Sequence, residues 1–223
     1  MFETVKYMNT APTKGASERA PAARRPVAVS FTKKFIDFCV AMGALLFLMP
    51  ALLTIALLIK IDSPGPVFFR QRRTGLDGRM FHIYKFRSMT VAEDGDRVVQ
   101  AKANDQRVTR IGRLLRRTSV DEIPQLLNIV KGDMSLVGPR PHALSHDQEF
   151  ASIVPEYNDR FQARPGLTGL AQVNGYRGEI ITRNDIEKRV AYDVQYIESW
   201  SIWLDIMTIL KTVPCLFGHK NAY

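Results

Sequence analysis

The sequence predicts a helix-rich, mixed α/β fold that is monotopic, meaning that it attaches to one face of a membrane. Three observations lead to this prediction. An uncharged run of 22 residues, Phe38 to Ile59, is long enough as a helix to cross a hydrocarbon core. Two short apolar segments flank an Asp-Gly pair, which indicates a small β-hairpin. Apolar residues three and four apart recur later in the chain, which is typical of amphipathic helices.

Composition narrows the kind of partner. The 223 residues are 46% hydrophobic, so the chain can bury a substantial core. Its formal net charge of +9 predicts an anionic partner, which would be nucleic acid, a phosphorylated ligand or an anionic membrane surface. The two cysteines, Cys39 and Cys215, indicate neither a disulfide framework nor a cysteine-based zinc site, so we expect a reducing compartment.

The chain divides into four predicted segments. Residues 1–32 are expected to form a disordered N-terminal tail, because small, polar and basic residues with proline crowd positions 9 to 30. Residues 33–61 are expected to form the membrane helix. Residues 62–217 are expected to form one domain at the cytoplasmic face, and residues 218–223 a short C-terminal tail.

Basic residues flank the apolar run on both sides. Arg24, Arg25, Lys33 and Lys34 precede it, and Lys60, Arg70, Arg72 and Arg73 follow it. Since Lys and Arg favour the cytoplasmic side, both ends are expected there. Pro50 offers a mechanism, because a proline inside a helix has no N–H to donate and clashes with the carbonyl of Leu46. We therefore expect a re-entrant helix broken at Pro50; a kinked single-pass anchor is the alternative.

After Pro64-Gly65-Pro66, two short strands are expected at residues 67–69 and 80–84, joined through Gly75-Leu76-Asp77-Gly78. Lys85 and Arg87 follow, and residues two apart in an extended segment point the same way. The two cations could clasp a diphosphate. A solvated strand edge protected by charge is the alternative reading.

Two amphipathic helices are expected beyond the hairpin. Five arginines lie between positions 107 and 117 among apolar residues at helical spacing, so the basic face could meet lipid phosphates or a nucleotide. Near the C-terminus, Ser201, Asp205, Thr208 and Thr212 line one helical face and apolar residues the other. Trp200 and Trp203 suit a headgroup boundary, so we expect an interfacial helix; packing on the protein's own core is the alternative.

Asp121 and Glu122 are the candidate catalytic pair. Pro124 favours a helix start near Asp121, so both carboxylates would lie at the positive end of a helix that stops at Gly132. Beside Arg116 and Arg117, a carboxylate could attack phosphorus or hold Mg²⁺. The alternative is an ordinary acidic first turn of a helix.

Two proline-stiffened loops each present an arginine. Gly138-Pro139-Arg140-Pro141 is the first, and Arg164-Pro165-Gly166-Leu167-Thr168-Gly169 is the second. A stiff backbone leaves less entropy to lose on binding, so Arg140 and Arg164 are expected to bind substrate or phosphate.

From about Lys33 to Lys211 the chain resembles the bacterial sugar transferases, the monotopic phosphoglycosyl transferases that load a sugar-1-phosphate onto polyprenyl phosphate. The resembling blocks are 68–71, Lys85-Phe86-Arg87-Ser88-Met89, 121–125, 131–135, 137–141 and 164–169. The resemblance implies that Asp121 is a nucleophile that takes a phosphosugar from a UDP-sugar and releases UMP, and that Glu122 helps hold Mg²⁺. Undecaprenyl phosphate then attacks the aspartyl intermediate.

The same resemblance assigns Lys85, Arg116 and Arg140 to phosphate or substrate contacts. It implies the cytoplasmic face of a bacterial inner membrane, downstream glycosyltransferases as partners and no nucleic acid, and it leaves a homodimer open. Mg²⁺ also suits oxygen ligands beside phosphates. Residues 169–179 and 192–201 look like the members that transfer glucose-1-phosphate to begin exopolysaccharide or capsule repeats. One departure is Met49, where some small members have Ser before the proline.

Three alternatives stay open at this point. The first is a member of the same family that transfers galactose-1-phosphate. The second is a non-catalytic, membrane-anchored basic binding protein in which Asp121 and Glu122 are structural. The third is an enzyme in which both carboxylates ligate Mg²⁺ and polyprenyl phosphate attacks the sugar nucleotide directly. Ping-pong kinetics would separate the third from the covalent mechanism.

Overall fold

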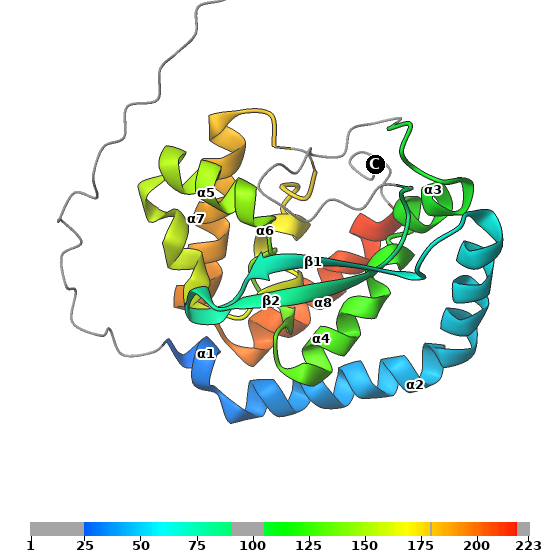
Figure 1. Ribbon diagram of the computed structural model, residues 1–223. Coiled ribbons are helices and arrows are strands. Elements are labelled where there is room, and N and C mark those ends of the chain that lie inside the picture. The colour runs from blue at the N-terminus through cyan, green and yellow to red at the C-terminus, as the bar shows by residue number, and fades with distance from the viewer. Residues whose placement is uncertain (1–24, 91–104, 179, 218–223) are drawn as a thin grey trace, which may run out of the picture.

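The computed structural model describes residues 25–90, 105–178 and 180–217, and Figure 1 shows their arrangement. The helices are α1 Pro26–Val29, α2 Phe31–Asp62, α3 Arg110–Arg117, α4 Leu126–Lys131, α5 Leu144–Ile153, α6 Leu170–Val173, α7 Arg183–Ser199 and α8 Ile202–Phe217. The 3-10 helices are η1 Leu76–Gly78, η2 Val120–Gln125 and η3 Pro155–Gln162, and the strands are β1 Phe68–Thr74, β2 Met80–Phe86, β3 Ser135–Val137 and β4 Gly166–Thr168. The predicted helix-rich, mixed α/β class is confirmed.

The predicted membrane segment lies in the long helix α2, which is continuous over 32 residues and carries Pro50 in its interior. Figure 1 shows that α2 bends, running along the lower edge and then turning upward towards α3. A proline deprives the carbonyl four residues earlier of its partner, which accounts for a bend in a helix of this length. The expected break is therefore a bend within one helix. By length and composition α2 is able to cross a membrane.

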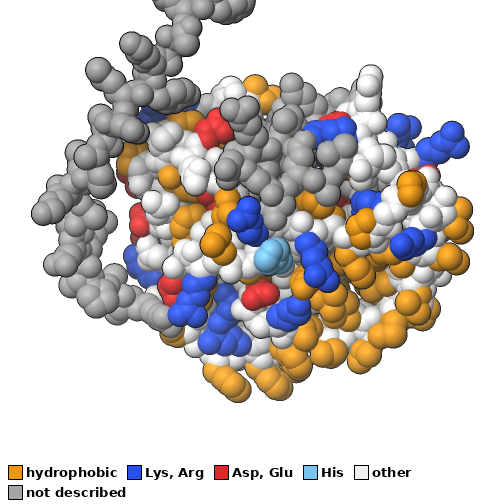
Figure 2. Space-filling model, in the orientation of Figure 1, with side chains coloured by type: hydrophobic (Ala, Val, Ile, Leu, Met, Phe, Trp, Pro, Cys, Tyr) orange, Lys and Arg blue, Asp and Glu red, His pale blue; other side chains and the backbone are white. Residues whose placement is uncertain are grey.

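Each half of α2 packs on a different part of the protein. Ala41, Ala44 and Leu45 join a core cluster with residues of β2 and α4. Leu52, Ile55, Ala56 and Ile59 join a second cluster with Phe86 and Leu115. The opposite side of the helix is apolar and exposed, including Phe31, Phe35, Leu46, Phe47, Leu53, Leu57 and Ile61. Figure 2 shows apolar side chains gathered along the edge that α2 forms.

The start of the described chain is helical. Residues 1–24 of the predicted tail, like the predicted C-terminal tail 218–223, lie outside the described residues. Residues 26–29 form α1, and Val27 and Ala28 are buried. Val27 belongs to a core cluster with Val137, Tyr196 and Ile197, which gives this segment the packing that its composition did not predict.

The predicted hairpin is confirmed. Strands β1 and β2 pair antiparallel, with Phe68 opposite Phe86 and Thr74 opposite Met80. The turn contains η1, where Asp77 and Gly78 adopt positive φ angles of 55° and 75°. Asp and Gly are the residues that tolerate such angles, so the Asp-Gly signal identified the turn.

A second, parallel pair of strands brings the two proline-stiffened loops together. Ser135 of β3 pairs with Gly166 of β4, and Val137 pairs with Thr168. A Cβ on Gly166 would lie 2.1 Å from the backbone nitrogen of Gly138, so only glycine fits at this crossing. The pairing therefore fixes where the loop after β3 begins.

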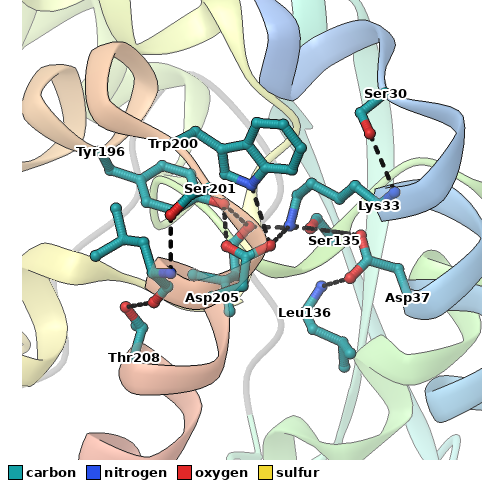
Figure 3. A network of polar contacts seen from close by, with 12 residues as sticks. Ser30, Lys33, Asp37, Ser135, Leu136, Tyr196, Trp200, Ser201, Asp205 and Thr208 are labelled. Carbon is teal, nitrogen blue, oxygen red and sulfur yellow. Dashed lines mark hydrogen bonds and ion pairs between the residues drawn. The ribbon is translucent and has the colours of Figure 1, made fainter.

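A buried polar network joins α2, β3 and α8 (Figure 3). The Lys33 ammonium lies 2.7 Å from Asp205 Oδ2 of α8 and 3.7 Å from Asp37 Oδ2. Asp37 accepts hydrogen bonds from Ser135 Oγ at 2.7 Å and from the Leu136 amide at 3.3 Å. Lys33 is 3% exposed, so it is an internal cation and not the solvated flank that its sequence position indicated.

The polar face of α8 points into the protein. Tyr196 and Trp200 both donate to Asp205, and Thr208 is buried (Figure 3). The apolar face points outward, with Trp203 68% exposed and Ile206, Ile209, Leu210 and Val213 also exposed. Most of the apolar face therefore does not cover the protein's own core, although Leu204 packs against the cluster that contains Val137 and Tyr196.

Candidate active site

Asp121 and Glu122 lie in the 3-10 helix η2. Ser119 precedes it in the left-handed conformation, with φ 58°, and its carbonyl accepts the Glu122 amide at 3.1 Å. The α-helix α4 begins only at Leu126 and ends at Gly132, where φ is 82°. The expected helix start near Asp121 is thus corrected to a 3-10 turn. Pro124 has no N–H for the α-helical pattern, and the tighter turn accommodates it.

Two cations hold the Glu122 carboxylate. Lys85 Nζ lies 2.8 Å from Oε1, Arg140 Nη2 lies 2.6 Å from Oε1, and Arg140 Nη1 lies 3.2 Å from Oε2. Burial alone would raise the pKa of Glu122, but the charges of Arg140 and Lys85 outweigh it and hold the pKa well below its usual range. Glu122 is therefore a permanent anion at the centre of this cluster.

Asp121 has the opposite electrostatic character. Burial and the charge of Glu122 raise its pKa to about 6, although Lys85, Arg116 and Arg140 oppose the shift. The residue is 8% exposed, and no described residue donates a hydrogen bond to its carboxylate. A carboxylate with few hydrogen bonds and a raised pKa is the more nucleophilic member of such a pair. The two adjacent acids therefore suit different roles.

Arg116 completes the predicted cations around the pair. It comes from the end of α3, which is capped at its start by the Thr109 side chain. Its Nη1 donates to Met89 Sδ at 3.4 Å, and its charge acts on Asp121. Hence the structure brings together Lys85, Arg116 and Arg140 from β2, α3 and the loop after β3.

Arg87 lies outside this cluster. It follows the end of β2 at Phe86, and its guanidinium donates to Ser63 O at 2.6 Å, Ser63 Oγ at 2.8 Å and Pro64 O at 2.9 Å. Ser63 and Pro64 directly follow the last residue of α2, so the Arg87 side chain caps the C-terminal end of this helix. That Lys85 and Arg87 clasp one diphosphate stays a prediction, and in the structure their charged groups have different partners, since Lys85 contacts Glu122.

Arg164 also lies away from the carboxylates. Its Nη2 is 3.5 Å from the carbonyl oxygen of Ala28 in α1. Burial lowers its pKa, and the charge of Asp37 in α2 opposes that shift. Arg164 therefore belongs to the junction of α1 and α2. Although β3 and β4 pair, Arg140 in the loop after β3 contacts Glu122, whereas Arg164 in the loop before β4 contacts Ala28.

A buried layer behind Arg140 was not predicted from the sequence. Arg160 Nη2 donates to the backbone carbonyl of Arg140 at 2.6 Å and to Asp193 Oδ2 at 2.8 Å. Arg160 Nη1 donates to Tyr157 Oη at 2.8 Å and lies 2.7 Å from His142 Nδ1. Burial, together with the charge of Arg160, lowers the pKa of His142 well below its usual range, so this ring is neutral.

Arg73 and Arg177 are two further cations that sequence reasoning missed. Arg73 donates to Gln71 Oε1 and, at 3.4 Å, to Pro141 O; burial and the charge of Arg140 lower its pKa to about 10. Arg177 Nη2 donates to Ser119 Oγ at 2.5 Å. In the sequence, Arg73 was one of several basic residues after the apolar run and Arg177 lay inside the motif 169–179, so nothing distinguished either as part of the site.

The carboxylate pair could hold a divalent cation. Mg²⁺ commonly binds one or two carboxylates with water and phosphate oxygens. The Glu122 carboxylate has about four lone-pair sites, and three of them accept hydrogen bonds from Lys85 and Arg140. The remaining site and the lone pairs of the neighbouring Asp121 carboxylate could bind a cation. Among the described residues, no group of three or more His, Cys, Asp or Glu side chains is placed to hold a metal. The donor set therefore fits a hard cation shared with a substrate.

A buried nucleophile-type carboxylate, a permanently charged partner and several cations define an enzyme that acts on a phosphate group. Residues 28–219 match the profile of the family described as bacterial sugar transferase, and the chain belongs to this family.

Relatives in this family carry specific names. The chain is 52% identical over 197 residues to the UDP-glucose:undecaprenyl-phosphate glucose-1-phosphate transferase of Caulobacter vibrioides, covering 88% of this chain and 74% of the relative. It is 50% identical over 191 residues to the Klebsiella pneumoniae protein of the same name, covering 86% and 41%. The UDP-galactose-lipid carrier transferase of Erwinia amylovora is 39% identical over 210 residues, covering 86% and 42%.

Proposed function

We propose that this protein transfers glucose-1-phosphate from UDP-glucose to undecaprenyl phosphate, releasing UMP, as the first step of exopolysaccharide or capsule repeat assembly. The observation that carries this proposal is the unequal placing of the two carboxylates: Lys85 and Arg140 bond Glu122 and hold its pKa low, whereas the pKa of the buried Asp121 is raised to about 6. Glucose is supported by the relatives at about half identity, which are named for UDP-glucose, whereas a relative named for UDP-galactose is less similar.

The reaction follows in two displacements. In the first, an Asp121 carboxylate oxygen forms a bond to the sugar-bearing phosphorus of UDP-glucose, and the bond from that phosphorus to the bridging oxygen breaks. UMP leaves with the bridging oxygen. In the second, an oxygen of undecaprenyl phosphate bonds to the same phosphorus and the Asp121 oxygen leaves. The products are a lipid diphosphate-linked sugar and the original carboxylate.

The surrounding side chains have separate tasks. Glu122 keeps Lys85 and Arg140 beside Asp121, so their charges are already in place when negative charge moves on the phosphoryl oxygens. Arg116 adds a third positive charge near the nucleophile. Mg²⁺, held by Asp121, Glu122 and phosphate oxygens, would neutralise further charge on the leaving group.

Sugar choice and the need for Asp121 are tested by UMP release. Purified protein with Mg²⁺ and undecaprenyl phosphate should release UMP faster from UDP-glucose than from UDP-galactose. Asp121→Asn should abolish release, whereas Glu156→Gln, a change at an exposed site, should not alter it. A preference for UDP-galactose would support the alternative sugar. No release from either donor would leave the binding-protein reading.

We also propose that α2 is a re-entrant membrane helix and α8 an interfacial one, at the cytoplasmic face of the bacterial inner membrane. The outward apolar faces of both helices, together with the bend of α2, support this placement. Cysteines at Arg25 and Pro66, in a chain without Cys39 and Cys215, test it. Labelling of both from the cytoplasm is expected, and labelling from opposite sides would establish a single-pass anchor.

A further inference from the structure

Arg177 is anchored in the connection between α6 and α7, close to the carboxylate pair. The Tyr176 amide donates to the carbonyl of Ala171 at 3.0 Å, and Arg189 Nη2 donates to the carbonyl of Gly178 at 2.9 Å. Both neighbours of Arg177 in the chain are therefore fixed. Its guanidinium reaches Ser119 Oγ at 2.5 Å, two residues before Asp121. The side chain is presented to the start of η2 by a backbone that is already ordered.

Within the described part of the chain, the charge of Arg177 is not compensated by an ion pair. Whereas Lys85 and Arg140 both contact Glu122, no carboxylate among the described residues lies within ion-pair distance of Arg177. A guanidinium has five N–H donors, and the bond to Ser119 uses one of them. Burial and the charge of Arg140 lower the pKa of Arg177, and the charges of Glu122 and Asp121 act in the opposite direction.

A half-buried cation beside other cations is stabilised when an anion binds. The donor brings a diphosphate to Asp121, and Glu122 already engages two of the cations there. Planar guanidinium groups match phosphate oxygens in two-point contacts. We infer that Arg177 binds a phosphate oxygen of the UDP-sugar beside Asp121. This inference deepens the proposed function and rests on it.

A structural role is the competing explanation, in which Arg177 acts only by holding Ser119 and hence the turn that carries Asp121. The two roles predict different behaviour of a double variant. If Arg177 only holds Ser119, Ser119→Ala should cost as much as Arg177→Gln, and the double variant should cost no more than either. If Arg177 binds phosphate, the losses should differ and should multiply.

The kinetic test is UMP release in a single turnover of the full chain in nanodiscs, with UDP-glucose and no lipid acceptor. Arg177→Gln should slow release by about 10²-fold or more, the size seen when one preorganised donor to a developing anion is removed. Arg177→Lys should recover part of the rate, and Ser119→Ala should cost less than about tenfold. Equal, non-multiplying losses for Arg177→Gln and Ser119→Ala would overturn the inference.

A binding measurement makes the inference testable without turnover. In the Asp121→Asn background, Arg177→Gln should weaken the binding of UDP by at least about tenfold, which equilibrium titration measures. Unchanged UDP affinity would overturn the inference whether or not the wild-type protein is active. A defect confined to the discharge of the adduct by undecaprenyl phosphate would also overturn it, since it would assign Arg177 to the acceptor. Failure of wild-type UMP release with normal UDP binding would instead contradict the proposed function.

Discussion

Replacing Lys33 with methionine should destabilise the protein far more than removing a surface ion pair of the same length. The Lys33 ammonium lies 2.7 Å from Asp205, and the two side chains are 3% and 14% exposed (Figure 3). Arg183 lies 2.7 Å from Glu187 in α7, but these side chains are 69% and 45% exposed. The pairs share a distance and differ in burial, so Arg183→Ala is the matched control.

The expected magnitudes differ by roughly tenfold. Removing one partner of a buried pair leaves an uncompensated charge and costs about 3–5 kcal/mol in free energy of unfolding. In this protein Lys33→Met leaves two carboxylates, those of Asp37 and Asp205, around the lost ammonium. An exposed helical pair four residues apart contributes only about 0.3–0.5 kcal/mol. Asp205→Asn should recover part of the loss in the Lys33→Met background, because it removes one of the stranded charges.

Thermal unfolding in nanodiscs measures this difference. For a chain of this length 1 kcal/mol shifts the midpoint by about 2–4 °C, so Lys33→Met should lower Tm by about 6–20 °C and Arg183→Ala by less than about 2 °C. Similar shifts for the two variants would refute the reasoning, since they would show that the Lys33 network carries no more stability than a solvated pair.

UMP release without lipid should rise with pH through about 6 and then level off, because Asp121, with its pKa raised to about 6, must be ionised to attack; a flat pH–rate profile would contradict this. Arg160→Met should lower kcat by about 10²-fold because it releases the Arg140 carbonyl, with partial recovery in Arg160→Lys; an unchanged rate would contradict this. Gly112→Ala should cost about 1–3 kcal/mol in unfolding free energy, since its Cβ would meet a backbone oxygen 2.1 Å away. Gly43→Ala, in open space, should add about 0.5–1 kcal/mol; a rise in Tm for Gly112→Ala or a fall for Gly43→Ala would contradict the expectation for that variant.

Local signals in the sequence predicted the elements whose causes are local. The Asp77-Gly78 turn identified the hairpin, because few other residues accept its backbone angles. The period of apolar residues in α8 defined two faces, although it did not show that the polar face, which carries Asp205, would point inward towards Tyr196. A helical period does not show whether the apolar face of a helix packs on the protein's own core or faces outward.

Contacts between distant parts of the chain escaped sequence reasoning. Lys33 looked like a solvated flank because its partner, Asp205, lies 172 residues away. The spacing of Arg87 from Lys85 predicted a phosphate ligand, but it did not show that the Arg87 guanidinium would bond Ser63 and Pro64 after α2. For Lys85 and Arg140, the resemblance to sugar transferases predicted a shared site, and the structure places both on Glu122. The sequence did not show that both cations would contact the same carboxylate, Glu122, because this contact depends on the three-dimensional arrangement.

The most direct test of the account is whether Asp121 carries the sugar phosphate. Purified protein would be incubated with Mg²⁺ and UDP-glucose, without lipid, and analysed by intact mass and peptide mapping. We expect a phosphosugar adduct on Asp121 that disappears when undecaprenyl phosphate is added and that Asp121→Asn does not form. UMP release that begins only on adding lipid, with no adduct beforehand, would contradict the account and establish direct transfer.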